Sequence, residues 1–345
     1  MSILDQEIRE QPAVLAVLLD AEMATARTVA EAMRAFNPAF VSIAARGTSD
    51  NAARYAQYVL GIHARLPVAL ATPSIHTLYQ TAPRLDRALV IGISQSGQAA
   101  DVCKVIEDAR AQGALTLSIT NFPDSPLAQA ADYHLALHAG EERSVAATKT
   151  YTAQLMAIAM IAAHLVDSDE MLDGLRHVPA DVEATLKLSA EIAAWAERYR
   201  YIEAIAAIGR GYNYCTAFEV NLKVQELCYV TGNSYSEADF LHGPIAMVQR
   251  GFPVLVVAPS GKTVGPMREF LSRLRDRDAE SLVISNEGEL LAAGTKQMRL
   301  PEGLAEWLSP IAAVIPGQIF AMLLAGAKGN PIDKPIGLSK VTVTL

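Results

Sequence analysis

The chain carries one sequence pattern twice, and the two copies lie about 164 residues apart. Apolar runs that end in polar, glycine-containing turns recur at this offset. Three pairs of landmarks show it: Gly47 with Gly211, Gly97 with Gly261, and, one position further apart, Asn121 with Asn286. Such agreement is hard to obtain by chance, so we expect two copies of one domain. A chain of 345 residues has room for two hydrophobic cores of ordinary size.

Within each copy, short apolar runs alternate with amphipathic helical patterns. Residues 89–93 form a β-prone run, and residues 101–110 then repeat apolar side chains at helical spacing. Alternation at this length is typical of a parallel sheet covered by helices. We therefore predict an α/β protein with two tandem domains, each a doubly wound, mostly parallel sheet flanked by helices.

The expected domain boundaries lie where the alternation starts and stops. They are an N-terminal helical arm at 1–34, a first domain at 35–168, connector helices at 169–200 and a second domain at 201–345. Pro12 is expected to break the N-terminal helix, because proline lacks the backbone N–H that a helix interior uses. The apolar stretches 155–166 and 311–327 are too short or too interrupted to cross a bilayer, so we expect buried helices there.

Charge and composition exclude several classes of function. The formal net charge is −8 and no cluster of basic residues occurs, so binding to DNA or RNA is not expected. Three scattered cysteines make no disulfide framework, and the N-terminus has no basic segment before an apolar core. We therefore expect a cytoplasmic protein with no membrane anchor.

The first copy carries a polar turn, Ser94-Gln95-Ser96-Gly97, between an apolar strand and a helix. Backbone N–H groups and the positive end of the helix dipole meet at such a turn and favour an anion. We interpret the turn as a cradle for a phosphate monoester; the alternative is a turn whose serines only cap the helix. The second copy has Pro259-Ser260-Gly261 at the equivalent place, so folding alone does not require the serine pair.

The second copy carries the residues suited to acid–base chemistry. Glu219, Lys223 and Glu226 are spaced so that all three share one face of a helix. They form either a reactive cluster or a surface ladder of salt bridges. His242 precedes a Gly-Pro pair, in a constrained loop before a new helix, and is either reactive or a capping or core histidine.

Other catalytic patterns do not occur in the sequence. There is no HExxH or Cys/His cluster for a metal, no Gly-x-Ser-x-Gly nucleophile turn, and no third glycine after Gly209 and Gly211 to complete a dinucleotide fingerprint. His134 and His138 are four residues apart, but they are expected on a strand with structural roles. We expect no metal and no organic cofactor.

Taken together and in this order, the motifs resemble those of sugar isomerase (SIS) domain proteins. The layout is most similar to the isomerase half of glutamine–fructose-6-phosphate aminotransferase, and the resemblance covers nearly the whole chain. Because the chain starts Met1-Ser2, without the N-terminal cysteine nucleophile of the glutaminase half, we expect no glutamine hydrolysis. The motifs are Gly47-Thr48-Ser49, Ser94-Gln95-Ser96-Gly97, Val145-Ala146-Ala147-Thr148-Lys149, Lys223-Val224-Gln225-Glu226, His242-Gly243-Pro244 and Lys340.

The resemblance implies a role for each matching residue. A phosphosugar would be held at its phosphate by Thr48, Ser49, Ser94, Gln95 and Ser96, and at its sugar by Gly47, Val145, Ala147 and Thr148. Glu226 would move a proton between C1 and C2 of the open-chain sugar, while Lys223 and Lys340 polarise the nearby oxygens. His242 would assist ring opening from the neighbouring subunit of a homodimer.

Two departures from the aminotransferase pattern bear on the substrate. Ala99 stands where those enzymes have a hydroxyl residue, and Ala147 stands where they have serine. We expect a deaminase or isomerase that converts an amino-sugar phosphate, such as glucosamine 6-phosphate, to fructose 6-phosphate and ammonia through an enediol or enolamine. The alternatives are a fructosamine-6-phosphate deglycase, in which Arg143 would accept a second charged group, and a phosphosugar sensor without catalysis.

Overall fold

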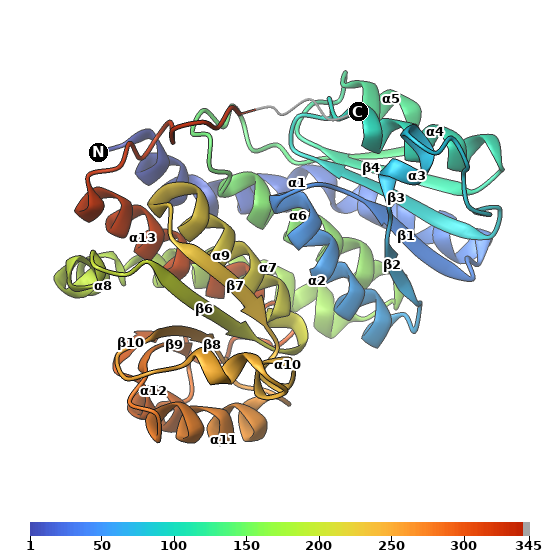
Figure 1. Cartoon of the computed structure of the whole chain (residues 1–345). Helices are drawn as coiled ribbons and strands as arrows, with labels where there is room; N and C mark the ends of the chain where they lie inside the picture. Colours follow the sequence, from blue (N-terminus) through green and yellow to red (C-terminus); the bar gives the residue numbers. More distant parts are fainter. Residues whose placement is uncertain (341–345) are drawn as a thin grey trace. The chain divides into compact units, whose positions relative to one another are not determined.

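The computed structural model describes residues 1–340 of the chain, which fold as two compact units (Figure 1). The first-copy unit consists of Glu10–Glu142, Ala147–Pro179 and the described residues from Ser339 onward. The second-copy unit consists of Met1–Arg9, Arg143–Ala146 and Ala180–Leu338. The range expected as connector helices, 169–200, is thus shared between the units. Residues 341–345, which end the expected second domain, lie outside the described residues.

The first-copy unit is built on a five-stranded parallel sheet with strand order β2-β1-β3-β4-β5. The central strand β3 is buried along its whole length, as expected for a parallel strand covered on both faces. Its Ile91 pairs with Ile43 of β1 and with Leu117 of β4. The strands are β1 (Phe40–Ala44), β2 (Val68–Leu70), β3 (Ala88–Ser94), β4 (Leu115–Thr120) and β5 (Tyr133–Ala136).

Two groups of helices cover this sheet (Figure 1). Helices α3, α4 and α5 pack over one side, where Val102 and Ile106 of α4 join Val90 and Leu127 in a buried cluster. Helix α2 packs with α6, which is buried along nearly its whole length as predicted. The bounds are α2 (Thr48–His63), α3 (Pro73–Thr77), α4 (Ala100–Ala111), α5 (Pro126–Ala130), α6 (Lys149–Leu165) and α7 (Asp169–Leu186).

The N-terminal helix α1 runs without a break from Ile3 to Phe36, so the predicted break at Pro12 is wrong. A proline removes one helical hydrogen bond, but its fixed φ is itself close to the helical value. The apolar stripe continues across the proline, with Ile8 before it and Leu15 after it both buried. Burial of this stripe outweighs the single lost hydrogen bond.

The second-copy unit repeats the first in its topology. Its parallel sheet has the order β10-β9-β8-β6-β7, so each sheet is ordered 2-1-3-4-5 when its own strands are counted along the chain. This identity confirms the duplication and the predicted fold class. The sequence analysis did not single out β7 and β10, because neither has an apolar run. The strands are β6 (Ala204–Gly209), β7 (Thr231–Tyr235), β8 (Pro253–Val257), β9 (Glu280–Ser285) and β10 (Lys296–Arg299).

The helices of the second-copy unit follow the same plan. Helices α10, α11 and α12 pack over one side of the sheet around Phe240 and Phe270, while α9 packs with α13. Within residues 1–340, α13 is the helix long and apolar enough to cross a membrane, but 83% of its apolar window is buried inside the protein, as predicted. The bounds are α8 (Ser189–Ala196), α9 (Tyr214–Cys228), α10 (Glu237–Leu241), α11 (Val264–Arg275), α12 (Gly288–Ala293) and α13 (Ser309–Lys328), with 3-10 turns η1 (Glu197–Tyr199), η2 (Gly211–Asn213) and η3 (Pro244–Met247).

The close packing of α13 on α9 depends on one glycine. A Cβ added at Gly317 would lie 2.2 Å from a methyl carbon of Val220, far inside van der Waals contact. We predict that Gly317→Ala lowers the free energy of unfolding by about 1–3 kcal/mol through overpacking, as measured by urea denaturation.

The matched control is Gly326→Ala in the same helix. A Cβ there would meet its nearest atom, on Ile332, at 3.7 Å, which is ordinary contact. Alanine at this position should leave stability unchanged or raise it by about 0.5–1 kcal/mol, because alanine favours the helix. Equal effects of the two substitutions would contradict the packing argument.

Candidate functional site

The predicted phosphate cradle lies where β3 ends and α4 begins, in the first-copy unit. The Oγ of Ser94 accepts a hydrogen bond from the Gly97 N–H at 3.1 Å, and the Oγ of Ser96 accepts one from the Gln98 N–H at 3.3 Å. Ala99 is the N-cap of α4 and makes no side-chain capping bond. The serines therefore close the turn instead of capping the helix, contrary to the alternative interpretation of this stretch.

Gly97 is the residue that makes this turn possible. Its φ is +64°, in the left-handed region that side chains rarely adopt, and an added Cβ would lie 2.2 Å from the Oγ of Ser125. Ser125 itself accepts a hydrogen bond from the Ala128 N–H as the N-cap of α5. The turn after β3 is thus packed tightly against the start of the next helix.

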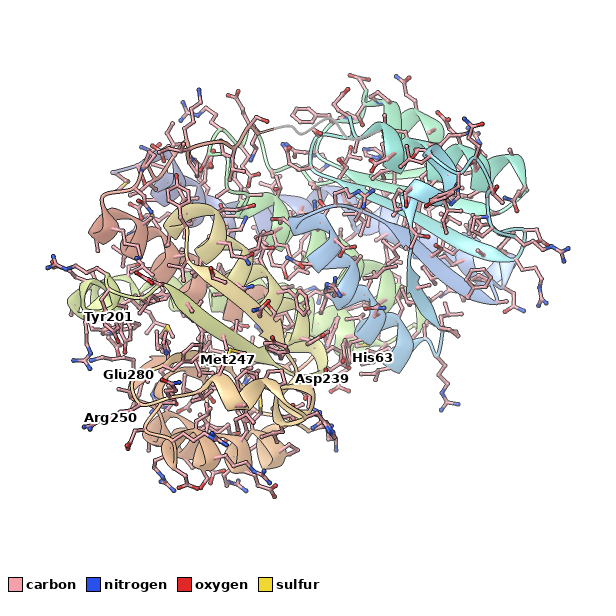
Figure 2. The ribbon with its side chains drawn as sticks, viewed as in Figure 1. His63, Tyr201, Asp239, Met247, Arg250 and Glu280 are labelled. Atoms are coloured by element: carbon pink, nitrogen blue, oxygen red, sulfur yellow. The ribbon has the colours of Figure 1, made fainter. Side chains whose placement is uncertain are left out.

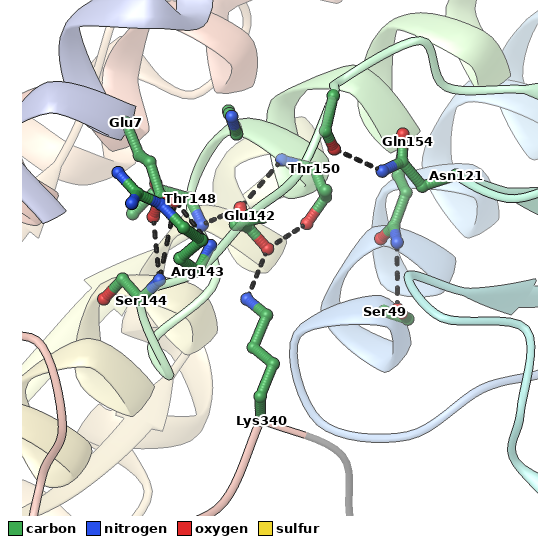
Figure 3. A network of polar contacts seen from close by, with 12 residues as sticks. Glu7, Ser49, Asn121, Glu142, Arg143, Ser144, Thr148, Thr150, Gln154 and Lys340 are labelled. Atoms are coloured by element: carbon green, nitrogen blue, oxygen red, sulfur yellow. Dashed lines mark hydrogen bonds and ion pairs between the residues drawn. The ribbon is translucent and has the colours of Figure 1, made fainter. Parts of the chain in front are cut away.

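A second predicted phosphate element follows β1, the strand beside β3. Gly47 is the N-cap of α2 with φ +52°, and Thr48 and Ser49 begin that helix. The Oγ of Ser49 accepts a hydrogen bond at 3.0 Å from Nε2 of Gln154, a buried residue of α6 (Figure 3). Because Ala44 of β1 pairs with Gly92 of β3, the structure brings both turns to one edge of the sheet.

This edge is the place where ligands bind in sheets of this kind. The strand order 2-1-3-4-5 reverses between β1 and β3, and open α/β sheets bind ligands at such a switch point, outside the carboxyl ends of the strands. Two helix N-termini, those of α2 and α4, meet there with Thr48, Ser49, Ser94, Gln95 and Ser96. The arrangement suits an anionic group bearing several hydrogen-bond acceptors.

Arg46 adds a cation to this edge that sequence reasoning missed. Its guanidinium lies 2.7 Å from a carboxylate oxygen of Asp101, a fully buried residue in the first turn of α4. The pairing offsets a negative charge that would otherwise oppose anion binding at the α4 N-terminus. The feature of the sequence that could have indicated this cation is the position of Arg46, directly before Gly47 of the predicted phosphate element.

The loop between β5 and α6 is held by two buried carboxylates, one in each unit (Figure 3). In the second-copy unit, Glu7 accepts hydrogen bonds from the backbone N–H groups of Arg143 at 2.6 Å and Ser144 at 3.2 Å. The predicted sugar-binding residue Val145 belongs to the same unit, and its N–H donates to the carbonyl of Asp333. The Arg143 residue as a whole is exposed.

In the first-copy unit, Glu142 plays the corresponding part. Its carboxylate accepts hydrogen bonds from the Thr148 and Thr150 N–H groups. It also forms an ion pair with Lys340, whose Nζ lies 2.7 Å from a carboxylate oxygen. Burial would raise the pKa of the Glu142 carboxyl, but Lys340 and the N–H donors outweigh it and hold that pKa below its ordinary value. Ala147 and Thr148 belong to this unit, and the buried Thr148 hydroxyl finds no hydrogen-bond partner among residues 1–340.

The acid–base cluster of the second-copy unit lies on α9. Nζ of Lys223 is 2.7 Å from a Glu226 oxygen and 3.3 Å from a Glu219 oxygen, as the spacing predicted. The surface-ladder alternative is wrong, because the Lys223 side chain is 1% exposed and the Glu219 side chain is 0% exposed. Burial alone would lower the pKa of Lys223, but the two carboxylates raise it above its ordinary value and keep the amine charged.

Glu226 differs from its two partners in access. Its side chain is 24% exposed, whereas its Oε2, the oxygen that lies beside Lys223, is itself buried. A carboxylate beside a fixed positive charge, on a partly exposed side chain, can take a proton from a bound substrate while the cation stabilises negative charge.

His242 follows α10 at the surface of the second-copy unit. It is exposed, and its backbone N–H donates to the carbonyl of Asp239, which Figure 2 labels. The core-histidine alternative is therefore wrong and the imidazole is accessible, but the capping alternative is confirmed, because His242 is the C-cap of α10. His134 lies on β5, but His138 lies beyond the end of that strand with φ +50° and pairs with Glu22. The prediction that both sit on one strand is wrong for His138, because β5 ends at Ala136.

Metal and redox groups are sparse among residues 1–340. That part of the chain holds no cluster of three or more His, Cys, Asp or Glu side chains arranged to bind a metal ion. Cys103, Cys215 and Cys228 are buried thiols that form no disulfide, and burial raises the pKa of the Cys228 thiol to about 12. Such a thiol is a poor nucleophile at neutral pH.

Comparison with known proteins decides the family. A model of the SIS domain matches residues 8–164 and 201–325, which takes in both copies. The chain belongs to the SIS domain family. Each match contains one of the two parallel sheets, so the duplication seen in the sequence is a pair of SIS domains.

Relatives of this SIS protein include aminotransferases and isomerases. It is 33% identical over 345 residues to the glutamine–fructose-6-phosphate aminotransferase of Pyrococcus horikoshii. The alignment covers 98% of this chain and 57% of that protein. The chain thus spans somewhat more than half the length of the curated relatives it matches.

Two solved structures are similar along almost their whole length. The C-terminal domain of glucosamine-fructose-6-phosphate aminotransferase from Francisella tularensis has a TM-score of 0.88 at 26% identity, covering 97% of this chain and 98% of that one. A candidate phosphosugar isomerase from Silicibacter pomeroyi DSS-3 has a TM-score of 0.86 at 30% identity, covering 96% and 99%.

The buried cluster on α9 of the second SIS domain makes a prediction about stability. Lys223→Met leaves the buried Glu219 without its counter-charge, and we expect a loss of about 3–5 kcal/mol in the free energy of unfolding, measured by urea denaturation. The double substitution Lys223→Met with Glu219→Gln should recover much of that loss, because no buried charge then lacks a partner.

The first SIS domain supplies the control. Lys104 pairs with Asp108 at the same four-residue spacing, but its side chain is 45% exposed. Lys104→Met should leave the free energy of unfolding nearly unchanged, because water screens an exposed pair. If the Lys223→Met protein is as stable as the Lys104→Met protein, then the ion pairs of the α9 cluster contribute no more to the free energy of unfolding than an exposed pair does.

Proposed function

We propose that this SIS protein is a phosphosugar isomerase that acts as a deaminase on an amino-sugar 6-phosphate, with glucosamine 6-phosphate as the leading substrate. The observation that carries the proposal is the Glu226 carboxylate, which lies 2.7 Å from the buried ammonium group of Lys223, on a side chain that is 24% exposed. Aldose–ketose interconversion needs a base beside a fixed cation, and this pair supplies both.

The proposed reaction runs through an enolamine. Glu226 takes the proton from C2 of the open-chain aldose, and the electron pair moves to form the enolamine, whose oxygen Lys223 and Lys340 stabilise. Return of the proton to C1, with transfer of one proton from the nitrogen to the C1 oxygen, gives the C2 imine of fructose 6-phosphate, and addition of water then releases ammonia and the ketone. No step needs a metal or an organic cofactor.

The phosphate end of the substrate is proposed to lie at the edge formed by β1 and β3. Five hydrogen-bonding side chains and two helix N-termini meet there, which suits a dianionic monoester. The names of the relatives support a six-carbon sugar phosphate, since they are aminotransferases of fructose 6-phosphate. Three buried cysteines that form no disulfide are consistent with the reducing cytoplasm that we propose as the location.

The direct test is to incubate the pure protein with glucosamine 6-phosphate and to measure ammonia and fructose 6-phosphate together. We expect equal amounts of the two products. Release of an amino acid from a fructosamine 6-phosphate, with no ammonia from the amino sugar, would indicate a deglycase instead, in which the exposed Arg143 binds the second charged group. Absence of turnover with every phosphosugar tried would favour a sensor.

Glu226→Gln is the variant that tests the base within this assay. The amide cannot take a proton, so turnover should fall by at least about 100-fold while the Kd for the phosphosugar changes little. Glu237→Gln is a matched control, because Glu237 is also a glutamate of the second SIS domain and is paired with a cation, Arg210. Similar losses in both variants would contradict the assignment of the base.

His242 is proposed to act from the neighbouring subunit of a homodimer. Its exposure on the protein surface suits such a role, and two-fold dimers are the commonest closed assemblies. Glu226→Gln and His242→Ala subunits, each inactive alone, should regain part of the activity when they are mixed and allowed to exchange. Failure to regain activity despite demonstrated exchange would place both residues in one chain's site.

A further inference from the structure

Glu142 is a buried carboxylate of the first-copy unit with several hydrogen-bond donors around it. Its side chain is 0% exposed, and its two oxygens accept from four donors (Figure 3). The donors are the N–H of Thr148 at 2.9 Å, the N–H of Thr150 at 3.1 Å, the hydroxyl of Thr150 at 2.8 Å and Nζ of Lys340 at 2.7 Å.

Three of these donors come from the start of α6 and fix the carboxylate in place. Thr148 is the N-cap of α6 and makes no capping bond of its own, so Glu142 takes over the capping of that helix. A negative charge at this end is also favoured by the helix dipole. The position of Glu142 is therefore set by α6, independently of Lys340.

The fourth donor is the only charged one, and it comes from far along the chain. Lys340 lies 198 positions from Glu142, in the tail that follows the second SIS domain. Its side chain is 22% exposed, so the amine is held by the buried carboxylate yet is not sealed from the outside. A long side chain on a tail has many accessible rotamers, and one fixed, charged partner removes most of them.

We propose that Glu142 is the positioning residue for Lys340 in the reaction. The carboxylate, anchored by the first turn of α6, holds the tail lysine charged and in one place next to the predicted sugar contacts Ala147 and Thr148. This inference rests on the proposed function, which gives Lys340 its task of stabilising the sugar oxygens. It assigns a role to a residue that none of the sequence motifs singled out.

A merely structural role makes a different prediction. If Glu142 only capped α6, its loss would loosen the loop regardless of Lys340. Glu7 offers the matched control, because it is also a buried carboxylate that accepts backbone N–H bonds from this loop, but its partners are Arg143 and Ser144. Glu7→Gln therefore perturbs loop anchoring without removing the counter-charge of Lys340.

The kinetic arm compares Glu142→Gln, Lys340→Met and the double variant in the deaminase assay. We expect kcat to fall by about 100-fold in Glu142→Gln with little change in KM, because a misplaced catalytic group costs this much. The double variant should be no worse than Lys340→Met alone, and Glu142→Asp should recover part of kcat. The inference would be overturned if the loss of kcat in the double variant were the product of the two single losses. It would also be overturned if Glu7→Gln lost as much kcat as Glu142→Gln.

The second arm needs no activity. Acetylation of Lys340 by acetic anhydride, followed by mass spectrometry, reports how well its amine is held. We expect slow labelling in the unmodified protein and in Glu7→Gln, and labelling at least several-fold faster in Glu142→Gln. Equal rates in all three would overturn the inference whatever the substrate is. If the unmodified protein shows no deaminase activity but its Lys340 labelling still depends on Glu142, the proposed function is wrong and the positioning of Lys340 by Glu142 stands.

Discussion

The pairing of the Lys223 ammonium group with Glu219 and Glu226 is the interaction on which the charged cluster of the second domain depends. A buried charge is tolerated only when partners offset its lost hydration, and here both partners come from the same helix. Their spacing of four and three residues needs α9 to be regular from Glu219 to Glu226. Lys223 and Glu219 are buried, whereas the Glu226 side chain is 24% exposed.

The duplicated fold offers two equivalent edges, and the chain uses them differently. In each domain the strand order reverses between the first and third strands, which is where parallel sheets present helix N-termini. The first domain fills that edge with hydroxyl side chains and Arg46. The second has the buried charge cluster on α9, the counterpart of α2, and has Ala258-Pro259 where the first has Ser94-Gln95. One scaffold thus presents hydroxyl side chains in one copy and a cluster of charged side chains in the other.

Buried carboxylates hold the loop that leads into α6, and they explain why that loop is ordered without strands or helices of its own. Glu7 accepts backbone N–H groups in one unit and Glu142 does so in the other, where it also pairs with Lys340. Backbone donors that would otherwise be orphaned are satisfied by charge-assisted bonds, which are stronger than neutral ones. Ion pairing then couples the tail of the chain to this anchored loop.

The sequence by itself determined the duplication, the parallel sheets, the shared face of the α9 cluster and the burial of α6 and α13. The duplication follows from landmarks repeated about 164 residues apart, and the other features follow from periodicities of a few residues, which record local geometry. Tertiary structure alone decided that Lys223 is buried, that α1 passes through Pro12, and that Arg46 meets Asp101, 55 positions away, and Lys340 meets Glu142, 198 away. No local pattern encodes such pairs, because they form only when distant segments are brought together and water is excluded between them.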